Sequence, residues 1–311
     1  MAWLVYPGKH AESPAVAYTM LTLTAFFLAC NHIIGRAVHG EIPPVGLSFW
    51  RWVAGALILL PFALPGLRRQ WPLLRNHLGA VCLLGAFMVG STTLVLVALT
   101  RTYAINVSLI NAVQPTLTVF FAWLLFREPL SGWRSLGVVC GISGVVVMVT
   151  RADLSVLAGM DLLAGDFIAL LAMCGFAGYA LNLRRLPREI GVVVALLAIT
   201  VSGTLMLTPF YLWETLSVGV VPVTATSIAA ILALALLVTV LGNLCWYTGN
   251  RLIGPSRASI FINLIPVFGT LLAIAFLDER LYGYHITGGI LVIVGLLLAA
   301  GTGGRQQKQP D

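Results

Sequence analysis

The stretch SLINAVQPTLTVFFAWLLFREPLSGWRSLGVVCGISG, residues 108–144, has a second copy in SIFINLIPVFGTLLAIAFLDERLYGYHITGGILVIVG, residues 259–295. The two copies align without a gap at an offset of 151 residues, which pairs Pro115 with Pro266. The same offset pairs Glu128 with Glu279, Ser108 with Ser259, Gly137 with Gly288, Gly144 with Gly295 and, further upstream, Asn31 with Asn182. The chain is therefore predicted to be a duplicated unit, with repeats at residues 1–150 and 151–311.

Both copies lie in unusually apolar sequence. Of 311 residues, 59% are hydrophobic and only 9% are charged, whereas about a quarter of the residues of a soluble domain are charged. This composition excludes a set of soluble domains or a disordered chain, and the scattered basic residues disfavour a nucleic-acid-binding protein. Because about 20 apolar residues span a bilayer, we expect an all-α, polytopic membrane protein.

Ten apolar runs predict ten transmembrane helices, five in each repeat. They lie at residues 15–38, 45–64, 78–99, 104–126, 133–150, 166–184, 190–212, 226–249, 257–277 and 284–301. An odd number of spans makes the second repeat enter the membrane from the opposite side, so we expect two inverted five-helix repeats. Transporters use this arrangement to expose a midplane site to each side in turn. The alternative is a duplicated scaffold with no role in transport.

The basic residues predict the orientation of the chain. Thirteen of the 18 Lys and Arg residues lie in the tails and in the connections on one side of the predicted spans. Positive charge is enriched on the cytoplasmic side of membrane proteins, so both termini are predicted to be cytoplasmic. The net charge of +7 then reflects orientation and implies no acidic partner. The short loops favour a bacterial inner membrane. The five basic residues on the other side are Arg36, Arg51, Arg101, Arg151 and Arg280.

The repeated stretch also resembles the paired signature of EamA-type members of the drug/metabolite transporter superfamily. The resemblance rests on Pro115 and Pro266, on the acidic Glu128 and Glu279 and on the glycines that follow them, and it extends over essentially the whole chain. It implies ten helices in two inverted bundles and export of small metabolites from a bacterial cytoplasm. Within the superfamily the chain looks most like the YddG-like exporters of aromatic and other neutral amino acids. It departs from the family pattern where Arg127 and Asp278 replace the usual glycine.

Polar side chains inside the apolar runs mark the candidate site, because an unpaired amide in apolar surroundings costs a few kcal/mol. Helical spacing places three sets on three stripes. The stripes consist of Ser108, Asn111, Gln114 and Thr118; of Ser259, Asn263, Pro266 and Thr270; and of Thr239, Asn243, Trp246 and Asn250. We expect them to line one wetted, substrate-binding cavity that Asn31, His32, Tyr179 and Asn182 close. The alternative is that these groups only form hydrogen bonds between packed helices.

Several single residues have two interpretations. Each proline should kink its helix, so Pro115 and Pro266 are predicted hinges, unless the kinks only fit curved packing. His32 could be a proton site because imidazole changes charge near neutral pH, although we favour a hydrogen-bonded structural histidine. Arg51 is expected to snorkel to the outer interface rather than to pair with a substrate carboxylate. Gly137 and Gly141 permit close helix contact, either at a dimer face or within the monomer.

The predicted interior favours one class of substrate. No Asp or Glu lies in the middle of a run, so exchange of a lipophilic cation for a proton is disfavoured. Phosphorylated substrates would require buried basic residues, and only Arg51 approaches such a position. Amides, hydroxyls and aromatic rings suit a small zwitterion, so we expect a neutral or aromatic amino acid carried without obligatory proton coupling. One alternative is an exporter of lipophilic drugs or other metabolites. Another is a polar-lined channel, which fits the inverted repeat less well than a carrier does.

An enzyme is disfavoured because the five histidines are scattered and the chain has no HExxH, GxSxG or phosphate-binding loop. The five cysteines form no CxxC pair, which argues against structural zinc and a disulfide framework. No cofactor or metal is expected. The expected partners are the small-molecule substrate and the lipid bilayer, with the protein a monomer or a weak homodimer.

Overall fold

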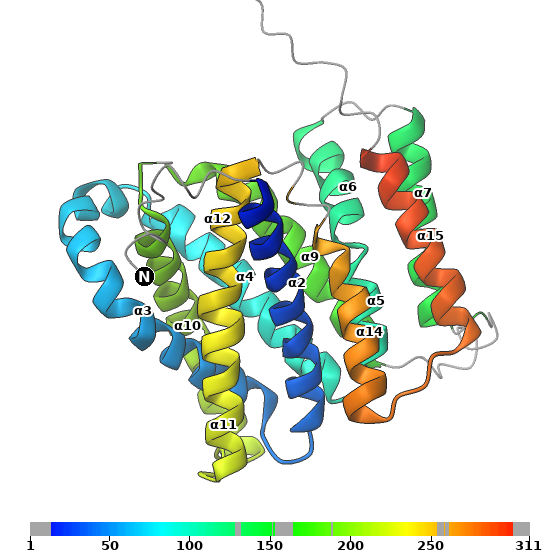
Figure 1. The fold of residues 1–311 in the computed structure, drawn as a ribbon. Coiled ribbons are helices and arrows are strands. Elements are labelled where there is room, and N and C mark those ends of the chain that lie inside the picture. The colour runs from blue at the N-terminus through cyan, green and yellow to red at the C-terminus, as the bar shows by residue number, and fades with distance from the viewer. Residues whose placement is uncertain are drawn as a thin grey trace, which may run out of the picture.

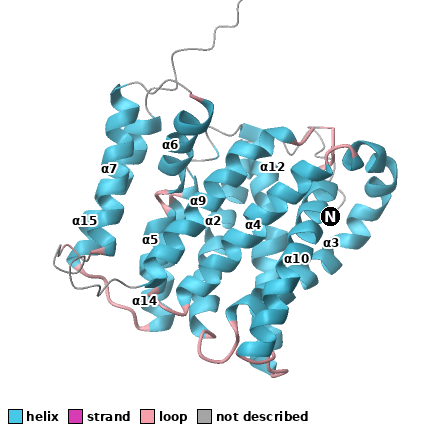
Figure 2. Cartoon of the chain, turned by 180° about the vertical axis from the view of Figure 1, so that it is seen from behind, coloured by secondary structure: helices cyan, strands magenta, loops and turns pink. Residues whose placement is uncertain are grey.

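The computed structural model describes residues 14–127, 132–150, 152, 164–187, 189–253, 258 and 261–300, and the regular elements of this part are all helices (Figures 1 and 2). Each of the ten predicted apolar runs overlaps at least one of them. The helices are α2 (Pro14–Ala37), α3 (Pro44–Arg75), α4 (Leu78–Leu99), α5 (Ala104–Asn111), α6 (Gln114–Phe126), α7 (Gly132–Val149), α9 (Ala164–Asn182), the 3-10 turn η2 (Leu183–Arg185), α10 (Val192–Ser217), α11 (Ala225–Ala233), the π-helix η3 (Leu234–Gly242), α12 (Asn243–Ile253), α14 (Leu264–Leu277) and α15 (Gly283–Ala300).

Within the described residues, six helical segments are long and apolar enough to cross a membrane. They are α2, α3, α4, α9 with η2, α10, and the continuous segment of α11, η3 and α12. Helices α5 and α6 together would make a seventh span, and shorter apolar helices lie within α7, α14 and α15. The described helices overlap all ten predicted runs, but six segments, or seven with the α5–α6 pair, have the length and apolarity of a membrane span.

Helix α3 is longer than predicted. The apolar run was expected to end at residue 64, but the helix continues to Arg75 with Pro61, Pro65 and Pro72 inside it. The added turns contain Leu, Arg and Gln, which favour helix even where the sequence is no longer apolar. Hydropathy predicts the apolar part of a helix but not the polar turns that extend it.

Both repeats break a helix upstream of the paired proline. Helices α5 and α6 meet at an angle of 44°, and Ala112 and Val113 lie between them. Pro115 has no backbone N–H to donate to the carbonyl of Asn111, so the kink predicted there is confirmed. In the second repeat Asn263 forms a turn before α14, at the offset of 151 from Ala112. The role of these breaks as hinges stays a prediction.

Helices α7 and α15 lie side by side at one edge of the molecule, as both views show (Figures 1 and 2). Glycines allow this close approach: a Cβ added at Gly144 would lie 2.6 Å from the carbonyl oxygen of Gly288. A Cβ added at Gly295 would lie 2.5 Å from the backbone nitrogen of Gly141. The face that carries Gly137 and Gly141 is therefore used for packing within the monomer.

Helices α6 and α14 end in the same way. Arg127 and Asp278, the two residues that replace the glycine of the family pattern, both have φ of 53° in the left-handed region. Glycine is favoured there because a side chain costs about 1–2 kcal/mol in this conformation. The turn geometry is thus retained in both repeats despite the substitutions.

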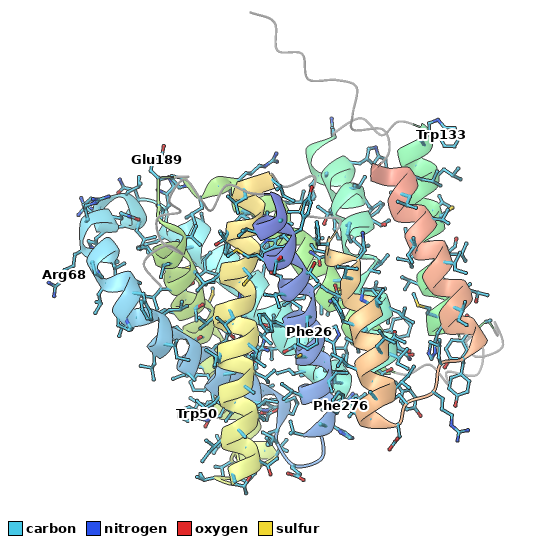
Figure 3. All side chains as sticks on the ribbon, viewed as in Figure 1. Phe26, Trp50, Arg68, Trp133, Glu189 and Phe276 are labelled. Atoms are coloured by element: carbon cyan, nitrogen blue, oxygen red, sulfur yellow. The ribbon has the colours of Figure 1, made fainter. Side chains whose placement is uncertain are left out.

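Two clusters of buried apolar side chains form the core, one around α4, α5 and α9 and the other between α3, α4 and α10. Many large apolar side chains also project outward (Figure 3), as expected of a surface that faces lipid. Figure 3 shows Trp133 and Glu189 at one end of the helix bundle and Trp50 and Phe276 toward the other. The helices therefore carry apolar side chains both on the faces that pack in the core and on the faces exposed at the surface.

Candidate functional site

A buried arginine lies between α2 and α3. The side chain of Arg51 is 0% exposed, and its Nη1 donates a hydrogen bond of 2.5 Å to Oδ1 of Asn31. Its guanidinium carbon lies 5.2 Å from the centroid of the Trp52 ring. No described residue accepts a hydrogen bond from its Nε or Nη2. The expectation that Arg51 snorkels to the outer interface is wrong, because α2 covers it and supplies the acceptor.

The π-helix η3 packs against α3 one turn beyond this arginine. A Cβ added at Gly55 would lie 2.5 Å from Cγ2 of Thr239, so the two helices are in close contact. Thr239 is fully buried and its hydroxyl oxygen has no partner. Asn243 donates to the carbonyl oxygens of Val238 at 3.3 Å and Thr239 at 2.9 Å. Its amide therefore supports the widened turns of its own helix.

The opposite side of α2 carries a second polar contact. Nδ1 of His32 lies 2.8 Å from Oγ of Ser108 on α5, and both residues are buried. A Cβ added at Gly269 of α14 would lie 2.2 Å from the Ser108 oxygen, so three helices meet at this contact. Because Asn31 and His32 are adjacent on one helix, their side chains diverge toward different neighbours.

The other predicted site residues are spread over the molecule. The hydroxyl oxygens of Tyr179 and Tyr247 lie 2.6 Å apart and join α9 to α12. Asn182 donates to the carbonyl of Gly178 in its own helix at 2.8 Å. At the helix breaks, Asn111 is buried, Gln114 is half-buried, and Asn263 has a buried Oδ1 without a partner; Trp246 of α12 is half-buried. Ser259 and the side chain of Asn250, predicted on the same stripes, lie outside the described residues.

A buried cluster around Asp166 was missed by the sequence analysis. Asp166, in the first turn of α9, is 1% exposed. Its carboxylate accepts hydrogen bonds from the Thr102 hydroxyl at 2.5 Å and from the Asn106 amide at 3.1 and 3.2 Å. Nε2 of His285 lies 2.8 Å from Oδ1 of Asn106. The available signal was the spacing of Thr102 and Asn106, which lie four residues apart at the start of α5, but both fall at the edge of a predicted span and not in its middle.

Two further carboxylates stabilise helix ends. Glu214 of α10 accepts from the backbone N–H groups of Val45 at 3.1 Å and Gly46 at 2.6 Å, at the start of α3. Glu279 accepts from the N–H groups of Ala104 and Ile105 at 2.8 and 2.9 Å, at the start of α5. A carboxylate favours this position because the first amides of a helix lack partners. Glu279 therefore stabilises the start of α5, whereas its repeat counterpart Glu128 lies outside the described residues.

A cavity of about 440 Å³ opens beside Glu279. Arg36, which lies 3.9 Å from Glu279, donates to the carbonyl of Leu99 at 2.8 Å and lies over the ring of Tyr103. His285 also lines this cavity and so connects it to the buried Asp166 cluster. The cavity thus has charges of both signs at one end of α2.

The model of the EamA-like transporter family matches residues 15–150 and again residues 163–301. The chain belongs to the EamA-like transporter family. Members of this family are transporters and not enzymes. The family match and the apolar helices show that the chain is a multi-pass membrane protein of the drug/metabolite transporter superfamily.

The EamA-like chain is similar to curated proteins over most of its length. The uncharacterized transporter YyaM of Bacillus subtilis is 25% identical over 288 residues, which cover 91% of this chain and 93% of the relative. A protein of Escherichia coli named a probable amino-acid metabolite efflux pump is 26% identical over 206 residues, 61% of this chain and 65% of the relative. A solved crystal structure superposes with a TM-score of 0.60 at 20% identity, covering 92% of this chain and 97% of the other, which shows a shared fold.

Proposed function

We propose that this EamA-like transporter exports small zwitterionic metabolites, and that its substrates are neutral or aromatic amino acids. The observation that carries this proposal is the chemistry of the described interior. Its buried polar side chains are mainly amides and hydroxyls, and Arg51 is the one Lys or Arg among them. A single cation suits one carboxylate, whereas a phosphate group is usually held by several basic groups. The printed name of the Escherichia coli relative also favours an amino acid over a lipophilic drug.

We infer that the two halves are inverted five-helix repeats that alternate access to a central site. The helix contacts support this, because they are conserved when the halves are exchanged. Contacts of α2 with α14 correspond to those of α9 with α6, and contacts of α4 with α9 correspond to those of α2 with η3 and α12. Pairs α3 with α10 and α7 with α15 each correspond to themselves. The paired helix breaks favour Pro115 and Pro266 as the places where the repeats bend.

The proposed location is a bacterial inner membrane with both termini cytoplasmic. Excess positive charge in the connections on one side supports this orientation. The cavity beside Arg36 and Glu279 would then open to the outside, because it lies at the end of α2 opposite the N-terminus. Solute leaving the central site would pass through this cavity.

The proposed transport cycle has no obligatory proton exchange. The structure buries Asp166 and Glu214, but both lie near helix ends and both are held by hydrogen bonds to donors of the protein. We therefore expect flux to follow the substrate gradient. Uptake driven by an imposed pH gradient and abolished in His32→Ala would contradict this mechanism.

Counterflow in proteoliposomes tests the proposed function. Vesicles that contain the purified protein are loaded with an unlabelled neutral or aromatic amino acid, and the labelled amino acid is added outside. We expect transient accumulation of label that saturates with concentration and persists without a pH gradient. Flux that rises linearly with concentration would favour a channel. Absence of exchange with every amino acid, together with exchange of another metabolite or drug, would reject the substrate class.

A further inference from the structure

The two unpartnered nitrogens of Arg51 form one edge of its guanidinium. Nε and Nη2 carry N–H bonds that point in nearly the same direction, which is the fork that matches the two oxygens of a carboxylate. The third nitrogen, Nη1, is held by Asn31, and the ring of Trp52 lies beside the group. Asn31 and Trp52 hold the guanidinium, and no described residue accepts a hydrogen bond from the edge formed by Nε and Nη2.

The described protein offers no carboxylate to this edge. Among the described residues, the ion pair found is that of Arg36 with Glu279. Asp166 is engaged by Thr102 and Asn106, and Glu214 by the first amides of α3. A buried charge without compensation costs several kcal/mol, so an arginine that no described carboxylate neutralises favours binding of an acidic ligand.

We propose that Arg51 binds the carboxylate of the transported solute through Nε and Nη2, and that Asn31 positions its guanidinium. This inference rests on the proposed function and assigns the contact that selects the solute. The carboxylate supplies two acceptors and one negative charge, which together satisfy both free donors and neutralise the arginine. The ligand class is therefore a small monocarboxylate, and neutral amino acids belong to it.

Three probes with the same aromatic side chain test the assignment. They are L-phenylalanine, its carboxamide L-phenylalaninamide, and 3-phenylpropionate, which has the carboxylate and lacks the ammonium group. Each is titrated against purified protein, with ligand-induced thermal stabilisation as the binding signal and inhibition of counterflow as the transport signal. We expect both carboxylates to bind wild-type protein more tightly than the amide by about tenfold or more, as hydrogen bonds to charged groups predict.

Arg51→Met and Arg51→Lys are compared with Arg75→Met, which removes an exposed arginine from the far end of the same helix. Arg51→Met should weaken binding of the carboxylates by about tenfold or more and leave binding of the amide unchanged, because only the carboxylates use the fork. Arg51→Lys keeps the positive charge but loses the two parallel donors, so its affinity for the carboxylates should lie between those of wild type and Arg51→Met. Arg75→Met should behave as wild type.

The outcomes separate this inference from the proposed function. If 3-phenylpropionate binds in an Arg51-dependent way and no amino acid is exchanged, the carboxylate site stands and the amino-acid substrate is wrong. If an amino acid is exchanged and Arg51→Met weakens acid and amide equally, or weakens neither, the function stands and the Arg51 assignment is wrong. Failure of wild-type protein to bind either carboxylate also overturns the assignment. Arg51→Lys decides the result if Arg51→Met does not fold.

Discussion

Asp166 and Arg51 are both buried charged residues, at 1% and 0% exposure, but their surroundings differ. The Asp166 carboxylate accepts hydrogen bonds from two neighbouring side chains, one of which is itself held by His285. Arg51 donates one bond to Asn31, and its other two nitrogens have no partner in the part of the chain that the structure describes. A charge that the fold fully satisfies contributes to structure, whereas one that the fold leaves partly unsatisfied is available to a ligand.

Removing a donor from the Asp166 cluster should have the largest effect on stability. Asn106→Leu removes the amide donor of the buried carboxylate and the oxygen that His285 contacts, so we expect a loss of about 3 kcal/mol or more, because an unsatisfied buried group costs about 1–3 kcal/mol and a charged one more. Thermal unfolding in detergent measures it. Asn182→Leu is the matched control, because the bond that Asn182 makes to the described residues is to its own helix. Equal stability of the two variants would show that the Asp166 cluster is not structural.

Arg51→Met should leave the stability of the protein unchanged or raise it. Replacing a buried, incompletely bonded charge by an apolar side chain of similar length is often neutral or stabilising by about 1–4 kcal/mol. We therefore expect the variant to unfold at the same or a higher temperature than wild type while counterflow of carboxylate substrates is lost. A destabilisation as large as that of Asn106→Leu would mean that Arg51, like Asp166, is primarily structural.

The location of the helices could be predicted from the sequence, and the neighbours of their polar groups could not. Apolar runs and the paired prolines were sufficient to place the helices and the kink before Pro115, because both depend on local chemistry. The bond from Arg51 to Asn31 and the bonds from Asn106 to Asp166 and His285 join different helices. Spacing along the chain gives the face on which a polar side chain lies, but the partner of that face is decided by tertiary packing.

Tertiary packing also explains why the residues of the predicted cavity contact different neighbours. Helical spacing predicts which polar residues share a face, but Asn182 and Asn243 bond to their own helices and His32 and Asn31 face different neighbours. Arg51 was assigned to the interface because it lies near the start of its apolar run, and only the packing of α2 over α3 reveals its burial. Asp166 was overlooked for the same reason at the start of α9.

Asn31→Leu should have a smaller effect than Asn106→Leu has on stability or Arg51→Met has on transport. It removes the acceptor of Nη1 and leaves all three guanidinium nitrogens without a protein partner, which should cost about 1–3 kcal/mol, the range for an unsatisfied buried group. The half-saturation concentration in counterflow should rise because the fork is no longer oriented, and added carboxylate substrate should restore part of the lost stability. Unchanged transport would show that Asn31 does not position Arg51.

Ser108→Ala should have the smallest effect of these variants. The bond between Ser108 and His32 joins two uncharged groups away from Arg51, so we expect a loss of about 1 kcal/mol and little change in substrate affinity. Ser91→Ala, a buried serine on α4, serves as the control for loss of a hydroxyl. A strong, selective loss of substrate affinity in Ser108→Ala would move the binding site to the α5 side of α2.

The most direct test is a structure of the protein with an amino acid that counterflow has shown to be exchanged. We expect the two carboxylate oxygens to lie about 2.7–2.9 Å from Nε and Nη2 of Arg51, with Nη1 still bonded to Asn31. A structure in which ordered water or a protein carbonyl satisfies Nε and Nη2, while the carboxylate of the bound amino acid lies elsewhere, would contradict it.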